Sequence, residues 1–130
     1  MNDLIKKISE MPNFRKTGGV SKDKITEAQD ILRLKFADDY KKYLEEFGTA
    51  SFSGHELTGI CNHPRLNVIH VTNEEKIINS GISEKFYVIE QSNIDGIVIW
   101  QSESGEVYQS IPGQKTIKIA KSLIDYVNRL

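Results

Sequence analysis

The stretch from residue 38 to residue 48 constrains the fold of this chain more than any other segment. Its aromatic and apolar residues recur at helical spacing, i, i+3, i+4 and i+7: Tyr40, Tyr43, Leu44 and Phe47. An acidic pair opens the stretch, where the helix dipole favours negative charge. Gly48 follows the last apolar residue, at the place where a left-handed residue ends many helices. The pattern predicts a helix with one face buried in a core.

Shorter helical patterns lie on both sides of this stretch. A first helix is expected over about residues 2–10, before Pro12, and Ser21 is a candidate N-cap for a second. The apolar stripe expected for the second helix is Ile25, Ala28, Ile31 and Leu32. Thr72-Asn73-Glu74-Glu75 matches a capping box, so it predicts the start of a short helix that ends at Gly81. Helical spacing returns at the end of the chain in Ala120, Leu123, Ile124 and Val127.

The second half of the chain carries strand patterns. Residues 86–90 and 97–100 are apolar at consecutive positions, which is typical of strands covered on both faces. Turn residues at 93–96, 102–105 and 112–113 separate these strands from further ones at 107–108 and at 117–119. Short strands are also expected at 56–57 and 66–68. The order predicts one α+β domain over residues 1–130, with N-terminal helices and a C-terminal helix packed on a central, mainly antiparallel sheet.

Composition excludes several classes of protein. The 130 residues carry a formal net charge of −1, so no global field attracts nucleic acid or anionic membrane. The longest apolar run, residues 97–100, is far too short to span a bilayer. A single cysteine cannot form an intramolecular disulfide, and the first residues do not resemble a signal peptide. We therefore expect a soluble cytoplasmic protein.

The order of these signals resembles the SUKH superfamily along nearly the whole chain. The matching features are Gly19-Val20-Ser21 before a helix, Glu27 and Ile31, Asp39-Tyr40 with Leu44 and Gly48, residues 71–74, the strand at 86–89, residues 105–108, and a last helix entered near Ser122-Leu123. Members usually carry Leu-Pro shortly before Asp-Tyr, whereas this chain has Phe36-Ala37. The resemblance implies an α+β binding scaffold without enzymatic activity. Bacterial members are mostly immunity proteins that sit on a toxin, commonly a nuclease.

Metal-binding residue types occur in one part of the chain: His55, Cys61, His63 and His70. Their spacing lacks the paired Cys-x-x-Cys or His-x-x-x-His geometry that holds zinc. Isolated histidines and cysteines of this kind are more often ordinary loop or core residues. We expect neither a metal nor another cofactor.

No catalytic constellation is recognisable. The adjacent carboxylates at 38–39, 45–46 and 74–75 would diverge on a helix, so solvated surface or dipole roles are favoured over acid–base chemistry. Residues 18–21 lack the lysine and spacing of a P-loop, and no Gly-x-Ser-x-Gly elbow occurs. The aromatic residues sit among aliphatic ones at core spacing, without interleaved basic residues, which disfavours direct nucleic-acid binding. The sequence indicates a protein that is not an enzyme.

The charge distribution suggests a partner surface. Residues 84–110 hold five acids, Glu84, Glu90, Asp95, Glu103 and Glu106, against Lys85, a net charge of −4. One interpretation is solubility and protection of strand edges; the other is a negative face for a basic partner. Trp100 and Tyr108 could line a groove beneath these charges, because both have polar tips suited to interfaces. The candidate partner-binding residues are therefore Glu90, Asp95, Trp100, Glu103, Glu106 and Tyr108.

Two functional hypotheses follow. The first is an immunity protein that binds and neutralises a cognate protein toxin in the cytoplasm by occlusion, the toxin being a nuclease with a basic surface. The second is a regulatory scaffold, also without enzymatic activity, that binds an endogenous protein or peptide. Genomic context distinguishes the two, because a toxin gene beside this one favours immunity. The sequence assigns no oligomeric state.

Overall fold

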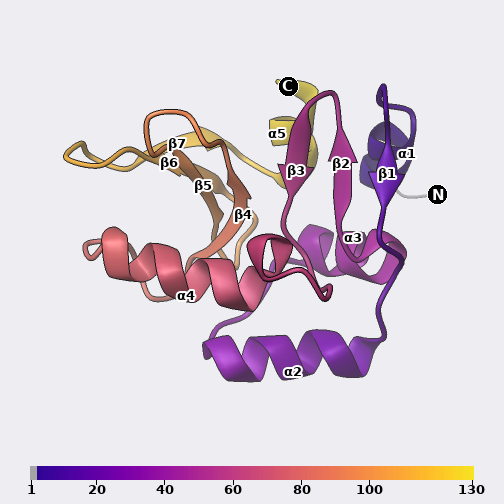
Figure 1. The fold of residues 1–130 in the computed structure, drawn as a ribbon, viewed down its shortest axis with the longest axis horizontal. Helices are drawn as coiled ribbons and strands as arrows, with labels where there is room; N and C mark the ends of the chain where they lie inside the picture. The colour runs from indigo at the N-terminus through magenta and orange to yellow at the C-terminus, as the bar shows by residue number, and fades with distance from the viewer. Residues whose placement is uncertain (1–2) are drawn as a thin grey trace.

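Seven strands form one antiparallel sheet in chain order, β1 to β7, in the computed structural model, which describes residues 3–130 (Figure 1). The strands are β1 (Arg15–Lys16), β2 (Ala50–Phe52), β3 (His55–Leu57), β4 (Tyr87–Gln91), β5 (Val98–Gln101), β6 (Val107–Ser110) and β7 (Ile117–Ala120). The helices are α1 (Asp3–Ser9), α2 (Lys22–Leu32), α3 (Asp38–Phe47), α4 (Val68–Ile78) and α5 (Leu123–Asn128), with the 3-10 helix η1 at Pro64–Leu66. The expected α+β class and antiparallel sheet are confirmed.

Side chains of helices cover both faces of the strands β4 and β5. On one face, Val71 of α4 packs with Val88, Val98 and Trp100. On the other face, residues of α1, α3 and α5 form the main core with Tyr87, Ile89, Ile99 and Val107. Helix α2 forms an outer layer against α3 and α4, below them in Figure 1. Consecutive strand positions are therefore buried, as the apolar runs in the sequence predicted.

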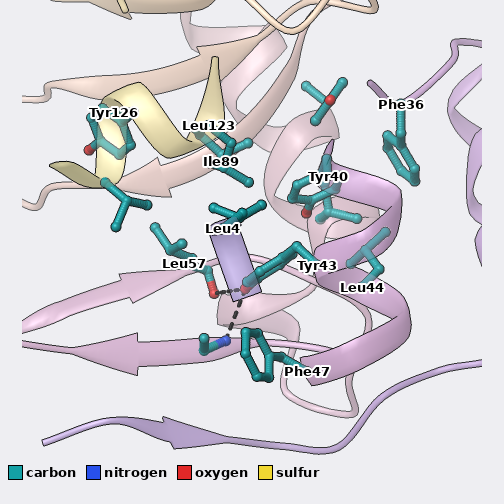
Figure 2. Close-up of a cluster of buried hydrophobic side chains, with 14 of the residues drawn as sticks. Leu4, Phe36, Tyr40, Tyr43, Leu44, Phe47, Leu57, Ile89, Leu123 and Tyr126 are labelled. Atoms are coloured by element: carbon teal, nitrogen blue, oxygen red, sulfur yellow. Dashed lines mark hydrogen bonds between the residues drawn. The ribbon is translucent and has the colours of Figure 1, made fainter. Parts of the chain in front are cut away.

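The face of α3 predicted to be apolar is buried at all four positions. Tyr40 and Tyr43 stack with ring centroids 5.4 Å apart, and Phe36 meets Tyr40 edge-on at 5.1 Å. The Tyr43 hydroxyl donates to the Thr58 carbonyl at 2.8 Å and accepts the Ala50 amide proton at 2.9 Å. Figure 2 shows this ring within the cluster that α3 shares with α1, α5 and the strands. The tyrosine-rich face thus both fills the core and satisfies backbone groups of β2 and the β3 end.

Gly48 ends α3 with φ 71° and ψ −69°, so the expected positive φ is confirmed, although the ψ angle lies outside the left-handed helical region. A Cβ on Gly48 would lie 2.1 Å from the Gly18 carbonyl oxygen. Gly59 lies against Gly48 in turn, where its own Cβ would lie 1.6 Å from the Gly48 oxygen. Backbone segments from three parts of the chain therefore meet without side chains between them.

Of two predictions for α2, the N-cap is confirmed and one residue of the buried stripe is wrong. Ser21 caps the helix as expected, because its side chain accepts the amide proton of Lys24. Ile31, however, is 53% exposed, so its assignment to the buried stripe is wrong. Helix α2 lies on the outside of the molecule and buries only the narrower stripe of Ile25, Ala28 and Leu32.

The predictions for residues 66–81 are wrong in their boundaries. Helix α4 begins after Asn67, whose side chain accepts the amide protons of Ile69 and His70. The expected strand at 66–68 is therefore the end of η1 and the start of α4, and α4 ends at Ile78, before Gly81. Thr72 is no cap: it is buried inside the helix, and its hydroxyl oxygen accepts the Val88 amide proton at 3.0 Å. A tertiary contact to β4 thus outweighs the local capping pattern.

Candidate functional site

A bulge in β4 decides where Glu90 points. Val88 pairs with Trp100 and Glu90 pairs with Ile99, so Ile89 is an extra residue opposite β5. Regular alternation would place Glu90 on the α4 face with Val88. The extra residue turns Glu90 to the opposite face, towards α5. Glu90 also forms, with Leu57, the one residue pair that joins β3 to β4 among the described strands.

Two side chains from distant parts of the sequence hold the Glu90 carboxylate. The Tyr126 hydroxyl on α5 donates to Oε1, and His55 Nδ1 on β3 lies 2.8 Å from Oε2. Because a carboxylate accepts hydrogen bonds, His55 carries its proton on Nδ1 in this contact. Burial raises the pKa of Tyr126, and the charge of Glu90 and the hydrogen bond to it raise it further. Tyr126 therefore stays a hydrogen-bond donor throughout the neutral range.

Glu90 is the one buried charged side chain within residues 3–130, with 4% of its surface exposed. It borders a cleft of about 370 Å³ between the end of α5, the turn between β4 and β5, and the neighbouring strands. Its lining combines polar residues with five apolar side chains: Ile94, Ile97, Ile99, Ile119 and Leu130. We call this hollow the Glu90 cleft. An apolar hollow with a few convergent polar groups is the usual form of a binding site.

The charged residues of the Glu90 cleft are of one sign. Glu90 and Glu56 line it, and no lysine or arginine does so among the residues that the structure describes. Glu56, at the margin, binds Arg65 through two hydrogen bonds of 2.7 and 3.1 Å, which lower the pKa of the Glu56 carboxyl. Glu90 has no such cationic partner in the described chain except His55. The cleft therefore suits a positively charged group better than a negative one.

The turn between β4 and β5 presents an apolar side chain above the cleft. Asn93, Asp95 and Gly96 adopt positive φ angles of 60°, 53° and 71°. Asparagine and aspartate adopt this conformation more readily than other non-glycine residues, so Asn93 and Asp95 suit a tight turn. Between them Ile94 stands with 63% of its surface exposed. The turn thus holds an apolar tip beside an acidic side chain.

Other hollows lack a buried charged group in the part of the chain described. One of about 520 Å³ lies between residues 17–20 and 60–63, and its charged side chain, Lys24, is exposed. Another of about 420 Å³ separates the end of α4 from residues 110–116, where Lys115 is also exposed. The Glu90 cleft is the better candidate because it combines apolar side chains with a buried charged group.

The residues predicted to bind a partner lie in different parts of the structure. Asp95 and Glu103 are exposed in turns, as expected, but these turns lie at opposite ends of β5. Glu106 and Tyr108 lie near Glu103: the Tyr108 hydroxyl donates to Glu106, and Lys118 pairs with Glu106 at 2.6 Å. These two contacts lower the pKa of the Glu106 carboxyl. The acidic segment is therefore not one continuous face, and part of its charge is already neutralised.

Two residues expected on that face lie in the interior. Trp100 is fully buried under α4, and its indole N–H donates to the Ser110 hydroxyl at 2.8 Å. The expectation that it lines a surface groove is wrong, because β5 is covered on both faces. Glu90 is likewise buried and lines the cleft named after it. Sequence reasoning missed His55 and Tyr126 as the partners of Glu90, since no local spacing connects residues about 35 positions apart.

The histidines and the cysteine considered as metal ligands contact different groups and do not come together. His55 contacts Glu90, His70 lies 2.7 Å from Glu74, and Cys61 Sγ contacts the His63 carbonyl at 3.6 Å. Across residues 3–130, no three histidine, cysteine or acidic side chains are grouped as metal ligands would be.

No helix in that range is long and apolar enough to cross a bilayer.

A family model described as SMI1-KNR4 cell-wall, SUKH_5, matches the chain over residues 1–130. The match spans every element described above and confirms the resemblance read from the sequence. No curated protein matches the chain.

Proposed function

The chain belongs to the SUKH superfamily, and we propose that it is an immunity protein that binds a cognate toxin and neutralises it by occlusion. The observation that carries this proposal is the family match over residues 1–130. An inhibitor of this kind needs a rigid scaffold and a contact surface, and no chemistry of its own. We therefore propose a binding role in the cytoplasm without enzymatic activity.

The surface around the Glu90 cleft has features of a protein-binding interface. Stable complexes bury about 1,200–2,000 Å² in total, with an apolar centre inside a polar rim. Around the Glu90 cleft, Ile94 is exposed and Ile97 and Ile119 are half-buried. Asn93 and Asp95 lie next to them as an exposed polar margin. This arrangement supports binding of a protein partner at that end.

The proposed toxin is a nuclease with a basic surface. Asp95 is an exposed acidic side chain in the turn beside the Glu90 cleft, and such charges speed the encounter with a basic partner. A nuclease presents positive charge to its nucleic-acid substrate, so an acidic inhibitor can capture the same face. Burial of the apolar centre would then slow release.

Co-expression tests the proposal. The chain is produced together with the toxic domain encoded beside it, and a toxin variant inactivated in its active site controls for the burden of expression. We expect restored growth, together with co-purification of the two proteins. Continued cell death with soluble, folded inhibitor present would contradict immunity and favour the regulatory scaffold.

A further inference from the structure

We infer that the Glu90 cleft receives a lysine or arginine side chain of the partner, with its charged end on the Glu90 carboxylate. This inference rests on the proposed function for the identity of the partner as the toxin. It specifies the anchor of the interface, which the family match leaves open.

The carboxylate of Glu90 has capacity for further hydrogen bonds. Two carboxylate oxygens offer about four acceptor positions, and Tyr126 and His55 occupy one each. A charge taken out of water is costly unless it is paired. Tyr126 and His55 each contact one carboxylate oxygen, but no lysine or arginine within residues 3–130 lines the cleft to supply a permanent countercharge. An incoming ammonium or guanidinium group would supply it.

The walls of the cleft fit the rest of such a side chain. Lysine and arginine bury their methylene stems along apolar surface while the charged end finds a polar partner. Ile97, Ile99 and Ile119 line the same cleft as Glu90, and the volume of about 370 Å³ lies within the usual range for a bound group. Apolar walls around the ion pair also exclude water, which strengthens the attraction.

The mouth of the cleft favours the same sign of charge. Asp95 is exposed in the turn that carries Ile94, close to the lining residues Asn93 and Ile94. An acidic side chain of a partner would meet repulsion from both Asp95 and Glu90. A neutral apolar side chain would leave the carboxylate without a countercharge. The charges therefore select a cation as the occupant.

The first experiment uses the free protein and a small probe. N-acetyl-arginine amide is titrated while the isoleucine methyl signals are followed by NMR, and N-acetyl-citrulline amide serves as a neutral probe of nearly the same shape. Hydrogen bonds to charged groups are strong enough for at least about tenfold tighter binding of the arginine probe. The shifts should centre on Ile97, Ile99 and Ile119. Equal affinity for the two probes, or shifts elsewhere, would overturn the inference.

Matched variants assign the selectivity to Glu90. Glu90→Gln keeps the size of the side chain and an oxygen acceptor, so it should remove the preference for arginine over citrulline. Glu103→Gln, an exposed acid at the other end of β5, should leave the preference unchanged. Retained preference in Glu90→Gln would contradict the inference. Near-UV circular dichroism establishes that each variant is folded.

A second variant keeps the test decisive if Glu90→Gln fails to fold. Ile94→Lys changes an exposed side chain at the mouth and adds a competing cation. It should weaken binding of the arginine probe several-fold and leave the citrulline probe unaffected. Unchanged arginine binding in this variant would contradict a cation site at the cleft.

The complex with the toxic domain separates this inference from the proposed function. Where wild-type protein restores growth, Glu90→Gln should raise the Kd for the toxic domain about tenfold, and Glu103→Gln should change it less than threefold. Restored growth without any effect of Glu90→Gln would overturn the anchor and leave immunity standing. Failed rescue with intact arginine selectivity would overturn the toxin as partner and leave the cation site standing.

Discussion

The surroundings of Tyr43 and those of Glu90 show two ways in which this fold treats a buried polar side chain. Around Tyr43, aromatic rings of α3 close the space completely, and the hydroxyl both donates to Thr58 and accepts from Ala50. Around Glu90, the carboxylate has its two partners and still borders a cleft of about 370 Å³. We call the surroundings of Tyr43 the sealed region, and we call the Glu90 cleft with its lining residues the open region. The first stabilises the molecule, and the second is available for contact.

A carboxylate that links distant elements has a different role in each of the two regions. Asp39 of α3 is also a carboxylate that links distant elements, since it accepts from the Leu123 amide and from the Gln101 side chain. It joins α3 to α5 and β5 and lines none of the hollows described above. Glu90 links α5 to β3 in the same way but faces a cleft. A structural carboxylate and a candidate contact carboxylate thus differ by what lies beside them.

Alkaline pH should produce the largest effect on stability. Burial is the main cause that raises the pKa of Tyr40, Tyr43, Tyr87 and Tyr126 above the ordinary value of 10.0. Folding therefore favours the protonated phenol, so its stabilisation is complete below pH 10 and is lost as the pH rises further. Each such tyrosine should cost about 1.4 kcal/mol per pH unit above pH 10.

Absorbance at 295 nm and circular dichroism test this during a titration with base. Ionisation of these four phenols should coincide with unfolding. Smooth ionisation in a folded protein would show that the sealed region is open to solvent.

Phe47→Ala should be the most destabilising single change considered for the sealed region. The ring of Phe47 is buried and contacts the rings of Phe14 and Tyr43. Removal of a buried aromatic side chain costs about 3–5 kcal/mol through lost burial and the cavity left behind. Urea denaturation measures the free energy of unfolding. A midpoint equal to that of the wild-type protein would contradict the packing of this face.

A pair of hydroxyl deletions compares the two regions directly. Tyr43→Phe leaves the Ala50 amide and the Thr58 carbonyl without this partner in a closed space, at a cost of about 1–3 kcal/mol. Tyr126→Phe also removes one hydrogen bond, but the freed oxygen of Glu90 borders the cleft, where water can replace it. We expect the smaller loss for Tyr126→Phe in the same denaturation experiment. The reverse order would show that the Glu90 region is the sealed one.

Ile94→Ser should have the smallest effect on stability. The side chain is 63% exposed, and exposed substitutions usually change the free energy of unfolding by less than about 0.5 kcal/mol. Binding should respond instead, because exposed apolar residues at an interface centre contribute to slow release. Surface plasmon resonance with the toxic domain should show faster dissociation, with Ile77→Ser on α4 as an exposed control. Equal dissociation rates in the two variants would separate Ile94 from the interface.

Patterns that are local in the chain could be predicted. The spacing of Tyr40 to Phe47 encodes α3, Ser21 encodes the start of α2, and apolar runs bounded by turn residues encode β4 and β5. Each of these signals depends on neighbours within about eight positions, where periodicity and capping act. The family resemblance follows from the same local signals in their order along the chain.

Features that depend on distant contacts could not be predicted. The bulge at Ile89 leaves no signature in the sequence, yet it moves Glu90 from one face of the sheet to the other. Thr72 resembles a cap locally, but its hydroxyl binds β4 instead. β1 and β2 are too short for a pattern and form only because they pair with a neighbour. The sequence therefore predicted an acidic surface that includes Glu90, whereas the structure places Glu90 in the wall of a cleft.

Hydrogen exchange on the complex with the toxic domain tests the central claim most directly, because it maps the surface that the partner covers. The account predicts slower exchange in the open region, at residues 91–97, 117–119 and 126–130. It also predicts little change in α2 and in the turn at 102–105. Protection confined to α2 or to that turn, with unchanged exchange at residues 91–97, would contradict the account.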